Sequence, residues 1–578
     1  MATCSTRTFY GRRQGLTTSQ ADAILDSVCG ATSSDVDDSD DDIDFVASEN
    51  EVREDSSSSD ESSDEDESRP PARKVWKPSA SPPSNSGAQV LETGCRHDPS
   101  KGTFTPGDYF RQYFASSMYE TLAEKTNIRI LERNGTIAKV TRQEVQHFFG
   151  ISMLMSTTGY PRLRYYWKAG LGVQLIINAM ARDRFFRIRS NLTCTTEIEV
   201  PDAIKKEDRL WKVKPFVTMI QDGCLSLLRP NCFSIDEQMV PFTGRTSLKQ
   251  YVPNKPHPIG LKNFVLAGQD GLVYDFHLYQ GKSTFPDYGL GVSGNSVVHL
   301  CQTIPQDSTL YFDRWFTSVP LLETLLKKKI FATGTIMKNR IPKTADLASD
   351  KELAKESRGK SDAVLKHDGS LSITKWYDKK AVTLASTAFG VEPVGTCQRY
   401  SKQEHRKVAV PRPMLVQKYN EKIRGVDLCD RMMSFYSQRR RTSRWTLRTM
   451  IHLVDLACVN AWIEYRANKK YLKQPAMQYI EFKISVAESL LSTILEEDSN
   501  SSDEDTVEVP RKRVKPLPSL PVRTSQALHM PKKENIKNAA RCRNPGCSKK
   551  TRHRCTSCDI YLCIETDRHC FFDFHTKK

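Results

Sequence analysis

Hydrophobic and polar positions follow two different periods along the chain. In its first ordered part, aromatic and apolar residues recur three and four positions apart, as in Tyr109, Phe110, Tyr113 and Phe114. This spacing places such residues on one face of a helix. The pattern therefore predicts a mainly helical region from about residue 105 to residue 230.

From residue 231 short runs of β-branched and aromatic residues replace the helical spacing. Strands are predicted at 264–267, 272–278, 309–312, 331–336, 372–377 and 381–386. A helix is predicted at 321–328, and a stretch rich in Lys and Asp, 342–368, interrupts the strands. Helical spacing returns from 419 to 494. Strands that alternate with helices are typical of an α/β domain.

The first 100 residues show neither period. Ser, Asp and Glu dominate as far as residue 68, and residues 35–67 alone hold 17 acidic residues against one basic residue. Such a segment has too little apolar surface to offset the entropy of ordering, so residues 1–100 are predicted to be disordered.

Removing the acidic segment changes how the charge of the chain is interpreted. The whole chain carries a net charge of +16, but outside residues 35–67 there are 84 basic and 52 acidic residues, a net charge of +32. This surplus favours a polyanionic partner, nucleic acid first, although charge that serves only solubility is the alternative. No apolar run approaches the roughly 18 residues that span a bilayer, so no membrane partner is expected. The N-terminus has no secretory signal pattern.

Three acidic sites follow apolar runs. Asp236 lies in Phe-Ser-Ile-Asp-Glu-Gln and Asp313 in Leu-Tyr-Phe-Asp-Arg-Trp-Phe, and an Asp at the end of a strand projects into the crevice at the sheet edge. Arg-Gly-Val-Asp-Leu-Cys-Asp places Asp427 and Asp430 on one face of a helix. Converging carboxylates could hold the two divalent ions that phosphodiester transfer uses. Spacing alone, however, favours ordinary capping and turn roles.

The sequence around these acids resembles the catalytic blocks of the piggyBac transposase family. Residues 234–245 (Ser-Ile-Asp-Glu-Gln-Met-Val-Pro-Phe-Thr-Gly-Arg), followed by Tyr-Val-Pro-Asn-Lys-Pro at 251–256, resemble the first block. Residues 311–321 resemble the second, and residues 418–430 resemble the third, including its paired aspartates. With shorter matches between and after them, the resemblance covers roughly residues 105–490.

The resemblance implies an α/β RNase H-like catalytic core with an insertion, flanked by mainly α-helical DNA-binding and dimerisation regions. Asp236 and Asp313 would lie on the sheet and Asp427 on a later helix, together holding two Mg²⁺ or Mn²⁺ ions. Asp430 would be a supporting carboxylate whose role stays open. The implied reaction is cut-and-paste transposition through 3′-end nicking and hairpin intermediates, with integration at TTAA.

The implied partners are double-stranded DNA, as terminal inverted repeats and TTAA target, and a second copy of the chain in a homodimer. The expected division of the chain is 1–100 disordered, 101–230 helical, 231–340 core, 341–414 insertion, 415–436 final core helix, 437–495 helical DNA-binding region, 496–540 linker and 541–578 zinc-binding domain.

Basic and aromatic residues near the acidic blocks are the candidate DNA contacts. They are Arg245, Lys255, Lys262, Arg439, Arg440, Arg441, Arg444 and Trp445. Arginine binds phosphate in bidentate fashion, and an indole can stack on an unpaired base, a contact worth about 1–3 kcal/mol. Packing in the core is the alternative for Trp445, and surface solvation is the alternative for Arg245, Lys255 and Lys262.

The C-terminal tail is rich in metal-ligand residues. Eight candidates lie within 34 residues, which suits two tetrahedral zinc sites in a cross-brace. One ion would bind Cys542, Cys547, Cys563 and His569, and the other Cys555, Cys558, Cys570 and His575, although His569 and Cys570 could exchange roles. His553 is set aside as a basic-face residue. Disulfides are the alternative, disfavoured in a nuclear protein.

The run Pro-Arg-Lys-Arg-Val-Lys-Pro at 510–516 indicates nuclear import. Its basic residues are Arg511, Lys512, Arg513 and Lys515. Neutralisation of the preceding acidic run is the alternative. Two functions therefore stay open: an active nuclear DNA transposase, and a domesticated, non-catalytic DNA-binding or chromatin protein that keeps the zinc-binding tail.

Overall fold

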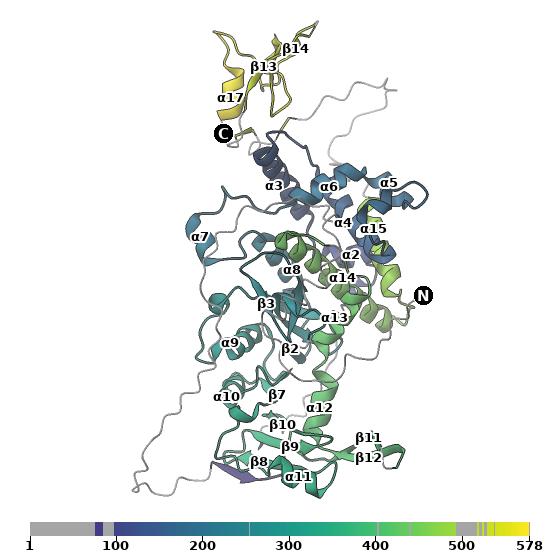
Figure 1. Cartoon of the computed structure of the whole chain (residues 1–578), viewed down its shortest axis with the longest axis vertical. Coiled ribbons are helices and arrows are strands. Elements are labelled where there is room, and N and C mark those ends of the chain that lie inside the picture. Colours follow the sequence, from purple (N-terminus) through teal and green to yellow (C-terminus); the bar gives the residue numbers. More distant parts are fainter. Residues whose placement is uncertain are drawn as a thin grey trace, which may run out of the picture.

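The structure, a computed structural model, describes residues 75–84, 98–253, 255–401, 404–438, 441–492, 517–518, 523–524, 529–536 and 538–576. The nuclear import run, Arg439 and Arg440 lie outside the described residues. The cysteine-rich tail lies at one end of the long axis of the molecule, and the strands of residues 361–412 lie at the other (Figure 1).

The predicted helical region forms seven α-helices. They are α2 (Pro106–Arg111), α3 (Ser116–Asn134), α4 (Arg142–Thr158), α5 (Gln174–Ala179), α6 (Arg182–Asn191), α7 (Asp202–Glu207) and α8 (Lys214–Leu225). Helices α2 and α4 each begin with a capping box. The side chain of the Thr before the helix accepts a hydrogen bond from the backbone N–H of the third helical residue, and the acidic side chain of that third residue accepts one from the backbone N–H of the Thr. Phe114, in the link between α2 and α3, makes ring contacts with Phe149 of α4 and Phe216 of α8. The helical prediction is confirmed.

The central sheet has ten strands in the order β1-β8-β9-β10-β7-β6-β2-β4-β3, with β5 beside β4. Their bounds are β1 Trp76–Pro78, β2 Cys232–Pro241, β3 Lys249–Tyr251, β4 Ile259–Gly268, β5 Val273–Leu278, β6 Thr309–Phe312, β7 Phe331–Thr335, β8 Ser361–Lys366, β9 Ser372–Tyr377 and β10 Ala381–Ser386. Only β2–β6 and β6–β7 pair in parallel among the described strands. Helices α9 (Gly291–Leu300) and α10 (Val319–Lys327) lie on the chain segments that precede β6 and β7. All six predicted strands are present.

The region expected to be an insertion continues the same sheet. β10 pairs antiparallel with β7, and β9 and β8 follow outward. The segment rich in Lys and Asp is ordered: it holds α11 (Asp350–Glu356) and β8, in which Ala363, Val364 and Leu365 are all buried. Hairpin β11–β12 (Gly395–Ser401, Arg406–Arg412) forms a separate two-stranded sheet.

Part of the acidic N-terminal region is also ordered. β1 pairs antiparallel with β8, and Trp76, only 6% exposed, supplies apolar contact that the surrounding composition lacks. The backbone continues the contact, because Ser79 N donates to Ala363 O and Val391 N donates to Ala80 O. The prediction of disorder over residues 1–100 is wrong for residues 75–84 and for residues 98–100, which begin a 3₁₀ helix.

Four helices follow the sheet strands: α12 (Met414–Lys422), α13 (Gly425–Phe435), α14 (Trp445–Tyr471) and α15 (Tyr479–Leu491). Helix α13 approaches the sheet very closely at its first residue, since a Cβ on Gly425 would stand 2.3 Å from the carbonyl oxygen of Gly268. Asn460 fixes α14 to β5 by donating to Val273 O and accepting from Val273 N. Short 3₁₀ helices lie at Pro99–Lys101, Leu163–Trp167, Lys282–Thr284, Cys301–Thr303 and Lys338–Arg340.

The cysteine-rich tail forms a separate small fold, named here the Cys/His module and made of residues 529–536 and 538–576. Strand β13 (Pro531–Lys533) pairs with β16 (His553–Cys555), and β14 (Ala540–Arg541) pairs with β15 (Lys550–Thr551), before helix α17 (Cys570–Thr576). The module therefore begins before residue 541, because Glu534 also accepts hydrogen bonds from Arg554 and Tyr561. Ile137 packs against its core.

No helix in the described residues is long and apolar enough to cross a membrane.

Candidate functional site

Asp236 and Asp313 lie on neighbouring parallel strands. Ile235 of β2 is opposite Phe312 of β6, so each aspartate follows the last residue of this parallel pairing. Asp313 directly follows β6, as predicted, but Asp236 does not end its strand. β2 continues to Pro241 because it pairs with β4 along its whole length, with Asp236 opposite Val265.

The turn after β6 holds Asp313 in place. One carboxylate oxygen accepts from Trp315 N at 2.8 Å, and the backbone carbonyl of Asp313 accepts from the Thr317 hydroxyl at 2.8 Å. Arg340 donates to the carbonyls of Trp315 and Thr317 and so fixes the turn from outside. Burial raises the pKa of Asp313, and the charge of Asp236 raises it further. The capping role and a ligand role are thus compatible.

Asp236 is in contact with a lysine. Lys255 Nζ lies 3.3 Å from Asp236 Oδ2, donates to Glu237 O at 2.8 Å and lies 3.9 Å from the Glu237 carboxylate. Burial raises the pKa of Asp236 to about 7 even though Lys255 opposes that shift. The pKa of Lys255 is itself raised by Asp236, Glu237 and Asp427, against the effect of its burial. This expected DNA contact therefore lies among the acids.

Asp427 and Asp430 reach the same place from α13. Gln238 Nε2 donates to Asp430 Oδ1 at 2.6 Å. Burial raises the pKa of Asp430 to about 6, with contributions from the charges of Asp236 and Asp427. Burial also raises the pKa of Tyr419 to about 12, where Asp313, Asp236 and Asp427 all contribute. We name Asp236, Asp313, Asp427 and Asp430 the acidic centre.

The donor set of the acidic centre fits a hard divalent cation. Mg²⁺ and Mn²⁺ prefer carboxylate oxygens and keep several water ligands, so a few acids around an open space suffice. Burial raises the pKa of both Asp236 and Asp430, and the charge of Asp236 raises that of Asp430 further, so a bound cation would relieve this repulsion. The acidic centre is not one of the two groups in the described residues that bring three or more ligand atoms within 4.8 Å of one another, so its acids do not form a closed cluster.

Those two groups lie in the Cys/His module. One is Cys542, Cys547, Cys563 and Cys570, and the other is His529, Cys555, Cys558 and His575. Seven of the eight predicted ligands are therefore brought together, in interleaved order along the chain. His569 belongs to neither group, and Cys570 joins the first group instead of the second. His529 was missed because it lies 13 residues before the first cysteine, outside the dense part of the motif.

The second group shows how its histidines are oriented. His529 Nδ1 lies 3.5 Å from Cys555 Sγ and 3.4 Å from Cys558 Sγ, and His575 Nε2 lies 3.4 Å from Cys558 Sγ. The other nitrogen of His575 contacts Phe571 O at 2.7 Å, which fixes Nε2 as the nitrogen that faces the sulfurs. The six cysteines of the module are free thiols. The arrangement can therefore hold two metal ions and does not support disulfides.

The other expected DNA contacts occupy different environments. Arg245 and Arg441 are exposed, whereas Lys262 Nζ lies 3.9 Å from the centroid of the Trp315 ring. Trp445 begins α14 and packs partly buried against the main core. Arg444 is 1% exposed and donates to the carbonyls of Arg189, Ser190 and Leu192, at the end of α6. The expectation that Arg444 contacts DNA is wrong, because its guanidinium joins α6 to α14.

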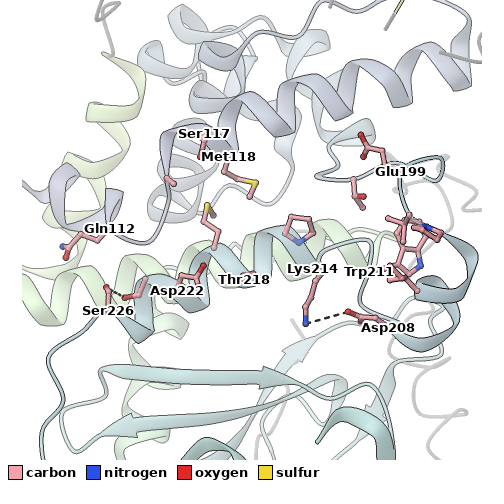
Figure 2. Close-up of a pocket in the computed structure, with 18 residues that line it drawn as sticks. Gln112, Ser117, Met118, Glu199, Asp208, Trp211, Lys214, Thr218, Asp222 and Ser226 are labelled. Carbon is pink, nitrogen blue, oxygen red and sulfur yellow. Dashed lines mark hydrogen bonds and ion pairs between the residues drawn. The ribbon is translucent and has the colours of Figure 1, made fainter. Parts of the chain in front are cut away.

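A groove of about 700 Å³ lies apart from the acidic centre, between α3, α8 and the segment around α7 (Figure 2). Met118, Met219 and Trp211 line it, and Lys214 contacts Asp208 at its edge. Glu199, Asp208 and Asp222 outnumber Lys214 on its walls, so the groove does not suit a phosphate backbone.

The chain resembles known transposases in sequence and in fold. A family model described as Transposase IS4 matches residues 105–462. Human PiggyBac transposable element-derived protein 3 is 28% identical over 484 residues, which cover 82% of this chain and 76% of that protein. Human PiggyBac transposable element-derived protein 2 is 29% identical over 380 residues, 63% of this chain and 62% of that protein.

A solved piggyBac transposase, in a synaptic complex with hairpin DNA, superposes with a TM-score of 0.58 at 21% identity and covers 82% of this chain and all of that one. The α/β core, its flanking helices and the Cys/His module thus define a transposase fold of the RNase H-like class. Within that class, the chain belongs to the piggyBac family.

Proposed function

We propose that this protein is a cut-and-paste DNA transposase in which Asp236, Asp313 and Asp427 hold divalent metal ions. The observation that carries the proposal is the juxtaposition of Asp236 and Asp313 at the end of the β2–β6 pairing, with the acids of α13 close enough to raise pKa values there. Family membership supports a transposase in general, and we propose that the reaction is excision through 3′-end nicks and hairpins followed by integration at TTAA.

Two Mg²⁺ or Mn²⁺ ions bound there would activate the attacking oxygen and stabilise the leaving oxygen of a phosphodiester. The residues of the chain itself supply the frame for that chemistry. The sheet fixes Asp236, the Trp315 amide orients Asp313, and α13 presents Asp427 beside them. Lys255 neutralises part of the acidic charge and stands where it could contact the substrate phosphate.

We propose that the Cys/His module holds two Zn²⁺ ions and contacts the transposon ends. Thiolate and imidazole ligands in two interleaved groups of four are the donors that structural zinc prefers. The module carries basic residues that suit phosphate contact, among them Arg541, Arg543, Lys549, Lys550 and Arg552. A homodimer on double-stranded DNA in the nucleus completes the proposal, with import through the run at 510–516.

The test is a nicking assay with full-length protein, Mg²⁺ and DNA that carries the terminal repeats flanking the gene. The wild-type protein is expected to nick and form hairpins, and Asp236→Asn and Asp313→Asn are expected to lose both activities because each removes an anionic ligand. Asp222→Asn is the matched control, since Asp222 is an exposed acid on α8. Equal cleavage by the wild-type protein and the two centre variants would overturn the enzyme proposal.

A second candidate is a non-catalytic DNA-binding protein. The observation that favours it is that the Cys/His module has its own ligands and its own small core, independent of the acidic centre. In that case deletion of residues 529–578 would abolish DNA binding, while Asp236→Asn and Asp313→Asn would leave every cellular function of the protein unchanged. Loss of function in the aspartate variants would exclude this candidate.

A further inference from the structure

Gln238 is a fully buried polar residue beside the acidic centre. It lies on β2 two positions after Asp236, so both side chains point to the same face of the sheet. Its side-chain amide contacts residues of three other elements, β4, α13 and α14. On α13 its nitrogen donates to Asp430 Oδ1 at 2.6 Å, which links the sheet to the last acid of the centre.

The orientation of this amide is fixed by Asp430, which accepts from its nitrogen, and by Asn263, which donates to its oxygen. Gln238 Oε1 lies 2.9 Å from His452 Nε2 and accepts from Asn263 Nδ2 at 3.3 Å. Asn263 is the residue directly opposite Gln238 in the β2–β4 pairing, so the backbone register holds it there.

His452 acts as a neutral donor in this arrangement. Burial, together with the charge of Arg448, lowers the pKa of His452 to about 3, so the ring carries one N–H at neutral pH. The amide oxygen can only accept, so the ring donates from Nε2. Turning the amide over would place its oxygen against the Asp430 carboxylate and its NH₂ against the NH₂ of Asn263. The NH₂ group is therefore held toward Asp430.

We propose that Gln238 is a positioning residue for the acidic centre, and that His452 and Asn263 position Gln238. By holding one oxygen of Asp430, Gln238 keeps the other oxygen available to a divalent cation against the repulsion of Asp236 and Asp427. The inference rests on the proposed metal-dependent function and gives Asp430 a role within it. Replacing a residue that forms a hydrogen bond to a metal ligand, without touching the metal itself, commonly changes the affinity for the metal.

The first test measures Mn²⁺ binding to the full-length, zinc-loaded protein from the electron paramagnetic resonance signal of free Mn²⁺. Gln238→Leu is expected to weaken Mn²⁺ binding about tenfold. The matched control is Gln221→Leu on α8. It removes a comparable hydrogen bond of 2.8 Å, which Gln221 Nε2 donates to Oδ1 of the buried Asp275. This control is expected to bind Mn²⁺ like the wild-type protein, because a purely structural loss does not reach the acidic centre.

The second test leaves β2 unchanged and replaces His452. His452→Gln keeps an N–H that can donate to Gln238 Oε1, whereas His452→Phe has none. We expect His452→Phe to weaken Mn²⁺ binding several-fold and His452→Gln to retain wild-type affinity. This rescue by a donor would not occur if His452 only filled space in the core.

The outcomes separate the inference from the function on which it rests. If Asp236→Asn weakens Mn²⁺ binding but Gln238→Leu and His452→Phe do not, the positioning role is overturned and the metal centre stands. If the wild-type protein and Asp236→Asn bind Mn²⁺ equally, the metal centre itself is overturned, and the positioning role with it.

Discussion

The acidic centre and the Cys/His module both bring ligand atoms together from separate positions, but different parts of the chain support them. The acidic centre depends on the ten-stranded sheet and on α13, and its acids Asp236 and Asp430 are only partly buried beside a large hydrophobic core. In the module the ligands are themselves core residues: five of its six cysteines are buried, beside only three buried apolar side chains, Ile560, Leu562 and Phe574.

The two regions differ in whether folding comes before metal binding. The part of the chain outside the Cys/His module, called here the main body, has a core large enough to fold without metal. We therefore expect metal to bind to an acidic centre that is already folded. The module has too few apolar side chains for an independent core, so metal binding and folding should be one event. Removing a ligand should therefore have opposite consequences for stability in the two regions.

The largest expected effect is unfolding of the module on loss of a ligand. Cys558→Ala and His529→Asn should release zinc and make residues 529–576 sensitive to protease, because structural zinc supplies roughly 10–16 kcal/mol to such folds. Zinc content and limited proteolysis measure the result. His569→Asn is the control, since His569 belongs to neither ligand group. Zinc loss in His569→Asn together with retention in His529→Asn would contradict the grouping.

The next effect lies in the helices that frame the acidic centre. Arg444→Met removes the donor from three buried carbonyl contacts and should lower the free energy of unfolding by about 3 kcal/mol. Urea denaturation of the main body measures the change. Arg441→Met, three residues earlier and exposed, should leave the unfolding midpoint almost unchanged. Equal midpoints for the two variants would show that Arg444 does not join α6 to α14.

A smaller effect of opposite sign is expected at the acidic centre itself. The pKa of Asp236 is about 7 in the folded protein, above the value of about 3.9 expected when unfolded. The folded state therefore binds more protons between these values, and this contribution to stability is lost as pH rises from about 4 through about 7. Asp236→Asn lacks this loss and should be about 1–3 kcal/mol more stable than the wild-type protein at pH 8.

Thermal unfolding in magnesium-free buffer at pH 5 and at pH 8 measures this difference. The advantage of Asp236→Asn should shrink as the pH falls, and Asp222→Asn, which removes an exposed acid from α8, is the control. A stability advantage that is equal at both pH values would contradict the assignment of the raised pKa to Asp236.

The smallest effect is expected at a surface contact. Arg245 lies exposed in the loop after β2, so Arg245→Ala should weaken DNA binding less than tenfold and reduce the salt dependence by about one phosphate contact. Fluorescence anisotropy at several salt concentrations measures both quantities. Lys351→Ala, on α11 far along the sheet, is the control. Equal salt dependence in all three proteins would remove Arg245 from the DNA contacts.

The sequence predicts the elements that have clear local signals. The strands at Thr309–Phe312, Ser372–Tyr377 and Ala381–Ser386 have the predicted bounds, because β-branched and aromatic residues fill them and turn residues end them. Strand β8 was not predicted, since its local composition resembles a linker and its stability comes from pairing with β9 on one side and β1 on the other.

The site was predictable only in part, for the same reason. The acidic blocks and the cysteine cluster carry recognisable motifs, so their residues could be named. The burial of Arg444 and the contact between Gln238 and His452 depend on tertiary packing between residues more than 200 positions apart in sequence, as their separations of 252–255 and 214 show. No periodicity or spacing records such a contact.

The pairing of β1 with β8 has a practical consequence for any shortened form of the protein. A version that begins at residue 98 would lose Trp76–Pro78 and leave one side of β8 with open backbone N–H and C=O groups. Open strand edges recruit strands from other molecules, so such a version is expected to self-associate and aggregate. Truncations meant to remove only the acidic segment at residues 35–67 should therefore end before residue 75.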